Sequence, residues 1–304
     1  MKKYTGSLLL MLAAFIWGTA FVAQADAAES IPPFAFSALR SFLGSFVLLI
    51  FIFVRARVNK EKVPHVAGRK LAVAGIICGV VLCIAMNLQQ VGISVYPGEV
   101  NNIPGRSGFL TAMYVVLVPI SGLFFHKKVS VLVWIATVLA VISLWLLCLK
   151  NGFGGIYFGD VLMFICAIAF TCHIITVDKF GSEVDGVMLS CVQFFVAGSI
   201  SLLISLLAEP RVDFQLITEA WLPILYVGVL SSGVAYTLQI IGQKNTEPAV
   251  ASILMSLESV FAVLGGWIVF HEALSGREML GCVCMFAAVI LSQVPQFIPK
   301  KADS

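Results

Sequence analysis

The chain has 304 residues, of which 60% are hydrophobic and only 12% are charged, and its formal net charge is +3. Soluble domains contain about 25% charged residues and less than half apolar ones, so this composition and a mean hydropathy of +1.02 exclude an ordinary soluble enzyme or binding domain. We expect most of the chain to lie in a lipid bilayer, and we expect no nucleic-acid partner.

Ten apolar runs follow one another along the chain, and each is close to the roughly 20 residues that a membrane-spanning helix needs. None of them alternates between apolar and polar residues as the strands of a membrane barrel do. A helix also satisfies its backbone groups within itself, so we predict an all-α polytopic membrane protein with ten transmembrane helices. The runs cover residues 6–24, 34–54, 71–92, 107–125, 131–149, 158–178, 186–207, 219–241, 248–270 and 279–297.

The first run has some features of a secretory signal peptide. Lys2 and Lys3 precede it, and AQADA at 23–27 contains the small-residue pattern of a cleavage site. The run is long for the apolar region of a signal peptide, and it has a counterpart later in the chain. We therefore expect it to be the first membrane helix rather than a removed leader.

The second half of the chain repeats the first in a sparse but ordered way. An offset of 153 residues matches the first two helices with the sixth and seventh, and an offset of 150 matches the third with the eighth. We therefore predict two five-helix repeats, residues 1–150 and 155–297. The matched positions include Gly6 and Gly159, Trp17 and Phe170, Arg40 and Gln193, Phe42 and Phe195, and Gln89 and Gln239.

The main difference between the halves lies before the fourth helix. The stretch SVYPGEVNNIPGRSG at 94–108 is longer than its counterpart QKNTEPAVAS at 243–252. Its Pro, Gly and Asn residues are typical of a loop, and we expect this loop to be exposed.

Because each repeat has an odd number of helices, the two repeats must have opposite orientations in the membrane. The charges of matching loops support this: RARVNKEKVPHVAGRK holds six Lys or Arg, whereas AEPRVDFQLITEA holds one Arg and three acidic residues. Positive charge favours cytoplasmic loops, and a cytoplasmic N-terminus places 14 of the 19 Lys and Arg on that side. We predict a protein of the plasma or inner membrane with both termini in the cytoplasm.

Four sequence segments resemble a known family. They are WGTAF at 17–21, ALRSF at 38–42, GFLTAMYVVLVPI at 108–120 and LESVFAVLGGWIVFHE at 257–272. Together they resemble the EamA-type transporters of the drug/metabolite transporter superfamily, over nearly the whole chain and as two EamA-like units. The resemblance implies transport of small metabolites, usually export, through a central cavity between the halves. Ser259 departs from the family, whose members often have proline in an L-E-P-V stretch here.

Glu258 is an ionisable residue in the middle of the ninth apolar run. At 1.5 Å per residue it lies roughly 15 Å from the start of this helix at Pro248, close to the middle of a bilayer. An ionisable residue at this depth is a functional hypothesis by default, and we name Glu258 as a candidate for coupling transport to protons or sodium. The alternative is a structural role, protonated or hydrogen-bonded to a neighbouring helix.

Other polar and aromatic residues in the membrane runs are candidates for binding a small substrate. An arginine binds carboxylates and phosphates through its planar fork, although Arg40 has the alternative of pairing with a glutamate or reaching the membrane surface. His173 can carry a proton or bond a neighbouring helix, and Trp17 can also serve as packing. The substrate-binding candidates are Trp17, Arg40, Asn87, Gln90, Tyr114, His173, Gln193, Tyr236 and Gln239.

These features predict a secondary transporter that exports a small organic metabolite, such as an amino acid or a similar zwitterion, by alternating access. Inverted repeats place such a site near the midplane, at their interface. The alternatives are an intramembrane enzyme, or a membrane receptor or scaffold without transport. The H-E-x-x-H, G-x-S-x-G and P-loop motifs do not occur, so we expect no enzyme, no cofactor and no metal. The sequence predicts neither the coupling ion nor the oligomeric state.

Overall fold

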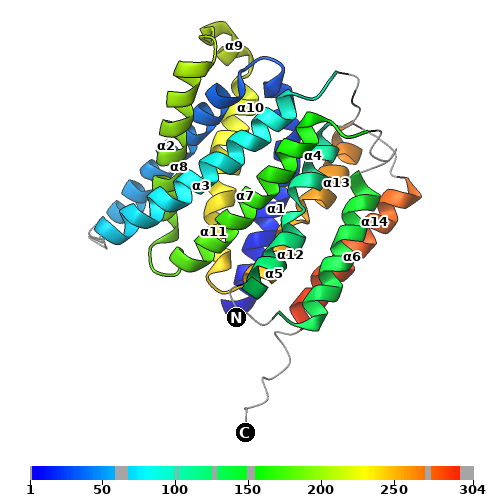
Figure 1. Ribbon diagram of the computed structural model, residues 1–304. Coiled ribbons are helices and arrows are strands. Elements are labelled where there is room, and N and C mark those ends of the chain that lie inside the picture. The colour runs from blue at the N-terminus through cyan, green and yellow to red at the C-terminus, as the bar shows by residue number, and fades with distance from the viewer. Residues whose placement is uncertain are drawn as a thin grey trace.

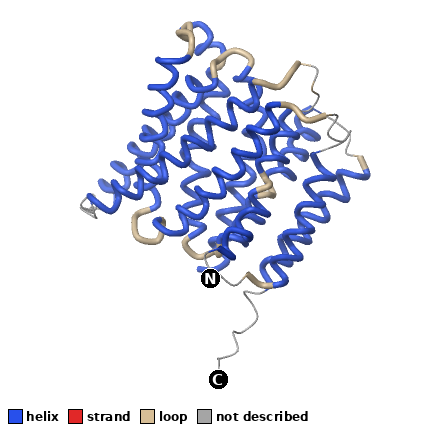
Figure 2. The backbone as a smooth tube through the Cα atoms, viewed as in Figure 1, coloured by secondary structure: helices blue, strands red, loops and turns tan. Residues whose placement is uncertain are grey.

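The computed structural model describes residues 2–58, 68–98, 100, 103–124, 129–148, 155–270 and 275–294. Throughout these residues the chain forms helices joined by turns and loops, without a strand (Figure 2). The uninterrupted long helices are α1 (Lys2–Ala28), α2 (Pro33–Val58), α3 (Gly68–Ser94), α6 (Val131–Cys148), α7 (Phe158–Phe180), α8 (Gly186–Ala208) and α14 (Gly276–Gln293).

Eight helical segments of the described chain are long and apolar enough to cross a membrane, and two further apolar segments, Val131–Leu147 and Pro248–Leu264, are shorter. The side chains are distributed as a bilayer requires: Leu8, Phe46 and Leu203 are about 60% exposed, whereas polar residues are buried inside the bundle. This is the reverse of a soluble protein, in which long exposed apolar faces are rare. The chain is therefore an all-α, multi-pass membrane protein.

Three of the apolar runs are interrupted, where the sequence predicts continuous helices. The fourth divides into α4 (Ile103–Thr111) and α5 (Tyr114–Phe124), and the ninth into α12 (Pro248–Met255) and α13 (Glu258–Phe270). The eighth contains a π-helix, η1 (Tyr226–Ala235), between α10 (Trp221–Leu225) and α11 (Tyr236–Gln243), and the short α9 (Phe214–Glu219) precedes it.

The breaks in the fourth and ninth runs have the same local cause. At both breaks the backbone forms tighter bonds to the third preceding residue, from Met113 to Leu110 at 3.2 Å and from Leu257 to Leu254 at 3.3 Å. Such a 3₁₀ turn inside a helix often marks a functional hinge. At the second break the Ser256 hydroxyl also donates to a backbone carbonyl of the preceding turn, which competes with the regular helical pattern.

The stretch 94–108 is not the fully exposed loop that its composition predicts. The helix α4 already begins at Ile103, and the side chains of Tyr96, Arg106 and Ser107 are buried. The physical reason is an ion pair: Arg106 holds a carboxylate on α7, and this contact draws the segment against the bundle.

Two pairs of helices pack antiparallel. Glu209, at the end of α8, accepts hydrogen bonds from the backbone N–H groups of Phe34 and Ala35 at the start of α2. At the other end of the pair, Arg55 forms an ion pair of 3.0 Å with Asp185. The helices α6 and α14 lie side by side at one edge of the bundle (Figure 1), and the start of α14 bonds the end of α6, since the Arg277 guanidinium donates to the carbonyl of Trp145.

Glycines allow two further helix pairs to approach closely. A side chain added at Gly6 of α1 would lie 2.8 Å from the carbonyl oxygen of Gly242 in α11. A side chain added at Gly159 of α7 would lie 2.9 Å from the carbonyl oxygen of Gly92 in α3. Small residues at helix interfaces permit this backbone approach in membranes, where van der Waals packing drives helix association.

The start of α1 and the end of α14 lie at the same end of the bundle, and α9 lies at the opposite end (Figure 1). Several of the charged residues that predict the orientation lie within residues 59–67, 125–128, 149–154 and 295–304. The family-like segment 257–272 ends with two residues of the range 271–274. All of these lie outside the described residues.

Candidate functional site

A cavity lies inside the bundle, where α1, α2, α7 and α11 meet the breaks of the two interrupted helices. Its volume accessible to a water-sized molecule is about 40 Å³, and residues from both halves of the chain line it. Its aromatic and apolar lining consists of Trp17, Phe21, Tyr114, Phe170, Ile174, Tyr236 and Met255. Its polar lining consists of Gln24, Arg40, Gln89, Thr111, Ser231, Gln239 and Glu258.

Glu258 opens α13 at one wall of the cavity. Its carboxylate accepts a hydrogen bond of 2.9 Å from the hydroxyl of Tyr114, the first residue of α5. On the other side, Gly18 of α1 makes room for this turn, since a side chain there would lie 2.5 Å from the Glu258 carbonyl oxygen. The glycine of the WGTAF segment thus permits α1 to pack directly against the start of α13.

Arg40 projects from α2 and is only 2% exposed. One terminal nitrogen, Nη1, donates to the side-chain oxygen of Gln24 at 2.9 Å, and the guanidinium carbon lies 5.7 Å from the centre of the Phe36 ring. The other two nitrogens, Nε and Nη2, have no hydrogen-bond partner among the described residues. A buried guanidinium that is only partly bonded is energetically unfavourable, so Arg40 stays a candidate for contact with a negatively charged group in the cavity.

Aromatic rings form the wall between α1 and α11. The ring of Trp17 meets that of Tyr236 edge-on at 4.8 Å between centroids, and Tyr236 makes a similar contact of 5.2 Å with Phe194. The indole nitrogen of Trp17 and the side-chain oxygen of Gln239 have no hydrogen-bond partner among the described residues. The wall therefore offers apolar ring surface together with one free donor and one free acceptor.

The structure brings six of the sequence-predicted residues together in the cavity lining, namely Trp17, Arg40, Tyr114, Tyr236, Gln239 and Glu258. The other four lie behind it. Asn87 joins α3 to α8 through a 2.8 Å hydrogen bond to Ser201, and Gln90 donates to the backbone carbonyl of Gln24. His173 lies 3.2 Å from the Gln193 side-chain oxygen, between α7 and α8.

Eight lining residues are not among these ten candidates, namely Phe21, Gln24, Gln89, Thr111, Phe170, Ile174, Ser231 and Met255. Phe21 and Met255 share a helix face with Trp17 and Glu258, respectively, and Phe170 is the repeat counterpart of Trp17, so helical spacing and the repeat carry a signal for these three. No sequence signal indicates Ser231, because it lies in the π-helix η1, whose residues do not follow the 3.6-residue period of an α-helix.

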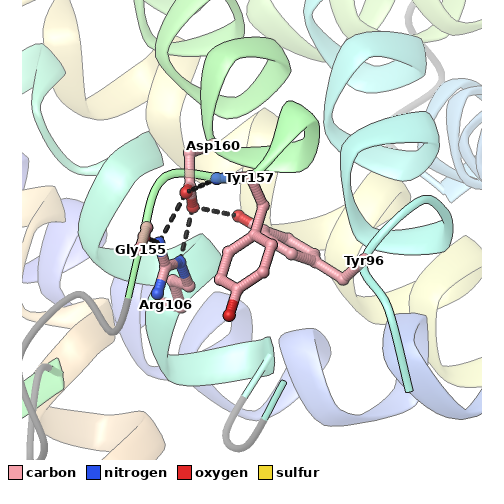
Figure 3. Close-up of polar contacts among 5 residues, drawn as sticks. All are labelled: Tyr96, Arg106, Gly155, Tyr157 and Asp160. Atoms are coloured by element: carbon pink, nitrogen blue, oxygen red, sulfur yellow. Dashed lines mark hydrogen bonds and ion pairs between the residues drawn. The ribbon is translucent and has the colours of Figure 1, made fainter. Parts of the chain in front are cut away.

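A buried polar cluster ties α4 and the turn after α3 to the start of α7 (Figure 3). Arg106 bonds both carboxylate oxygens of Asp160 through Nε and Nη2, each at 2.5 Å. Asp160 also accepts from the Tyr96 hydroxyl at 2.8 Å and from the backbone N–H of Tyr157, and Arg106 donates to the carbonyl of Gly155. Burial, together with the bond to the carboxylate, raises the pKa of Tyr96 above its ordinary value.

The opposite end of the bundle is hollow. A cleft in which about 540 Å³ is accessible to a water-sized molecule is lined by Gly122 of α5, Asp178 of α7 and residues 243–249 around the start of α12. One hydrogen bond links the lining of the cleft to that of the central cavity: Gln243 of the cleft donates to the backbone carbonyl of Ile174, which lines the cavity. Asp160 and Asp178 lie at opposite ends of α7, so the polar cluster and the cleft lie at opposite ends of the same helix.

The fold and the cavity define a polytopic helical membrane protein with a buried, charged chamber at its centre. The chain belongs to the EamA-like transporter family, whose sequence profile matches residues 4–149 and again residues 157–293. This confirms the resemblance found in the sequence, and the class is that of a membrane transporter.

Relatives of similar length support this assignment. A protein of Archaeoglobus fulgidus named "Uncharacterized transporter" is 28% identical over 291 residues, which are 95% of this chain and 86% of the relative. The "Uncharacterized inner membrane transporter YedA" of Escherichia coli K12 is 24% identical over 294 residues, 94% of this chain and 90% of the relative. A crystal structure with 18% sequence identity shares the fold, with a TM-score of 0.78 over 95% of this chain and 98% of that one.

Proposed function

We propose that the protein is a secondary transporter that carries a small organic metabolite, an amino acid or a similar zwitterion, across the plasma membrane. The observation that supports this most strongly is the central cavity, in which Arg40 and Glu258 supply opposite charges and aromatic rings supply apolar surface. Ligand pockets typically combine such apolar walls with a few polar groups. A molecule with a carboxylate, an amine and a modest apolar side chain matches this lining.

We propose ten membrane helices arranged as two inverted repeats, residues 1–150 and 155–297. The antiparallel packing of α2 on α8 and of α6 on α14 supports inversion, because these are the second and fifth helices of each repeat. Phe42 and Phe195, which are matched at an offset of 153, pack against each other at 6.0 Å. Two equivalent residues meet in this way only close to the axis that relates the halves.

The close glycine contacts support the same relation. The offsets match Gly6 with Gly159 and Gly92 with Gly242, so the contact of α1 with α11 and the contact of α7 with α3 are equivalent. The cavity walls are consistent with the same repeat relation. Six lining residues form three pairs matched by the offsets, namely Trp17 with Phe170, Phe21 with Ile174, and Gln89 with Gln239. The charged residues depart from this pattern, because the counterpart of Arg40 is Gln193, which lies behind the wall.

Alternating access is the mechanism we infer for this transporter, by rocking of one repeat against the other around the cavity. The difference between the two ends of the bundle supports it: the Arg106–Asp160 cluster holds one end closed, and a cleft opens at the other. The predicted orientation, with both termini in the cytoplasm, makes the cleft cytoplasmic. A transporter in this state is ready to load a cytoplasmic substrate, as export requires, with Glu258 as the candidate for ion coupling.

Counterflow in proteoliposomes tests the proposal. We expect liposomes loaded with a mixture of unlabelled amino acids to accumulate at least one labelled amino acid, and Gln89→Ala and Gln239→Ala each to weaken its binding about tenfold or more. This estimate corresponds to the loss of one hydrogen bond to a charged group, about 1.5–3 kcal/mol. Gln215→Ala, on exposed α9, is the matched control. If substitutions in only one half reduced affinity, a site shared between the halves would be wrong.

The same assay separates transport from the alternative functions. An intramembrane enzyme would convert the labelled compound, and chromatography of the liposome contents would reveal a product. A receptor or scaffold would bind a compound without moving it. Comparison of the metabolites released by cells that overexpress the protein and cells that lack it identifies the compound to be labelled.

A further inference from the structure

We propose that the Nε–Nη2 edge of Arg40 is the binding site for a carboxylate group of the transported molecule. The inference deepens the proposed function and rests on it. Both nitrogens belong to a side chain that is 98% buried, given its 2% exposure. Arg40 lines the central cavity, and both nitrogens lack a hydrogen-bond partner among the described residues.

The protein itself contains a filled example of this arrangement. Arg106 uses the same two nitrogens, Nε and Nη2, to hold the two oxygens of Asp160 in parallel (Figure 3). Such fork-to-fork bonding is the strong and geometrically specific way in which arginine binds a carboxylate. Arg40 presents the same edge, but none of the ion pairs found in the described residues involves it. We therefore infer that the carboxylate of the transported molecule is the partner of this edge.

The surroundings of Arg40 hold the guanidinium in place and leave only this edge free. Gln24 accepts from Nη1, on the side away from the free edge. Gln90 in turn fixes Gln24, by donating to its backbone carbonyl at 3.2 Å. The Phe36 ring lies one helical turn before Arg40, beside the guanidinium. Gln24 and Gln90 are thus positioning residues, and Arg40 is the residue that contacts the substrate.

The second charge in the cavity narrows the class of substrate. Glu258 lines the same cavity, and its only bond among the described residues is the one it accepts from Tyr114. A carboxylate there repels a second acidic group on the ligand and attracts an amine. The lining therefore selects a molecule with one carboxylate and one amine over a dicarboxylate or a phosphate ester. A phosphate ester also fits the arginine fork, but it brings a second negative charge into the cavity, which the Glu258 carboxylate repels.

Thermal unfolding of the purified protein tests the site without knowledge of the substrate. A buried charge without a partner destabilises a fold, and apolar residues of similar volume are often tolerated better. We therefore expect Arg40→Met to raise the unfolding midpoint by a few degrees in the absence of ligand. Arg211→Gln removes the same charge from an exposed loop position, and we expect it to leave the midpoint unchanged. A lower midpoint for Arg40→Met would make Arg40 a structural residue and overturn the proposal.

Ligand recognition supplies the second measurement. The probes are L-leucine and L-phenylalanine, their amides, which lack the carboxylate, and their aminophosphonic acid analogues. Each is titrated into wild type, Arg40→Lys and Arg211→Gln, with the shift of the unfolding midpoint as the readout. We expect the two amino acids to stabilise wild type and Arg211→Gln. We expect the amides and the phosphonic acids to have at least tenfold weaker effects, and Arg40→Lys, which keeps the charge but not the fork, to bind the amino acids at least tenfold more weakly.

The outcomes separate this inference from the proposed function. Equal binding of acids and amides, or full affinity in Arg40→Lys, would overturn the carboxylate site while transport through the cavity remains. Absence of both binding and counterflow for every amino acid would overturn the amino-acid substrate and, with it, this site. Arg40→Lys could also lose ligand binding and regain it when Glu258→Gln is added. That result would mean that Arg40 pairs with Glu258 rather than with substrate, and it would also overturn the proposal.

Discussion

Tyr114 donates a hydrogen bond to Glu258, and each of the two is the first residue of a helix that resumes after a break. One of these helices lies in the first half of the chain and the other in the second. Interrupted helices at corresponding positions of two repeats are a known indicator of transporter binding sites. The hydrogen bond joins both breaks at the wall of the cavity, so a movement that separates the two breaks must strain or break it.

The first prediction concerns this hydrogen bond. Tyr114→Phe keeps the ring but leaves the buried Glu258 carboxyl without its partner. We expect a loss of stability of about 1–3 kcal/mol, the typical effect of an unsatisfied buried group, measured as a lower unfolding midpoint in detergent. Tyr226→Phe removes a hydroxyl of the half-buried Tyr226 that bonds Thr19, away from the breaks, and serves as the comparison. Equal effects of the two variants would contradict a special role for the contact at the breaks.

The second prediction concerns ion coupling by Glu258. Glu258→Gln keeps the shape of the side chain and its capacity to accept from Tyr114, but it cannot ionise. If protons are coupled through Glu258, the variant should fold and exchange substrate across the membrane, yet fail to concentrate it when a pH gradient is applied. Uptake by proteoliposomes with and without the gradient measures both activities. Full gradient-driven uptake by the variant would leave Glu258 with a structural role only.

The third prediction concerns the buried ion pair at the closed end. Asp160→Leu leaves Arg106 without its carboxylate and also removes the acceptor of Tyr96. Breaking one partner of a buried pair costs about 3–5 kcal/mol, whereas replacing both by apolar residues is often neutral. We expect Asp160→Leu to unfold far more easily than Arg106→Met/Asp160→Leu, in a double-mutant cycle. Additive effects of the two single substitutions would show that the pair is not coupled.

The same ion pair is proposed to keep one end of the bundle closed, and this can be tested separately. In the Arg106→Met/Asp160→Leu protein, for which we expect nearly unchanged stability, a cysteine placed at Gln239 should become accessible to an impermeant thiol reagent from the closed end. The labelling rate in sealed vesicles, relative to the same cysteine with the ion pair intact, is the measurement. An unchanged rate would mean that the cluster stabilises the fold without controlling access.

The fourth prediction concerns the close glycine contacts. A methyl group at Gly242 would lie 2.9 Å from both the carbonyl oxygen of Gly6 and a side-chain carbon of Leu10. Overpacking typically costs about 1–3 kcal/mol, so we expect Gly242→Ala to lower the unfolding midpoint. Gly276→Ala, where nothing lies within 4 Å of the added methyl group, is the matched control and should be neutral or stabilising. A neutral Gly242→Ala would indicate that α1 and α11 can move apart freely.

The fifth prediction concerns orientation in the membrane. Gly98 and Ser182 are exposed in turns that follow α3 and α7, and the positive-inside rule places Gly98 outside and Ser182 in the cytoplasm. In a protein without its native cysteines, Gly98→Cys should react with an impermeant thiol reagent in intact cells. Ser182→Cys should react only after the membrane is permeabilised. The opposite labelling pattern would invert the proposed topology.

The sequence by itself determined that the protein is helical and lies in a membrane. A run of roughly 20 apolar residues in a bilayer satisfies its backbone polar groups only as a helix, so composition and run length alone decide this class. The predicted repeat offsets match Gln89 with Gln239, and both residues line the same cavity. The segment WGTAF pointed to the family, and the structure shows that the missing side chain of its Gly18 lets α13 approach.

Only the tertiary structure decided which polar residues face the cavity. Gln89 lines it, and its neighbour Gln90 does not, since successive residues of a helix point about 100° apart. In a soluble helix the apolar stripe reveals the inward face. In a membrane helix the lipid-facing and core-facing sides are both apolar, so that signal is lost. The sequence also did not predict the helix breaks before Tyr114 and Glu258, because these breaks depend on backbone hydrogen bonds and helix contacts that no residue pattern specifies.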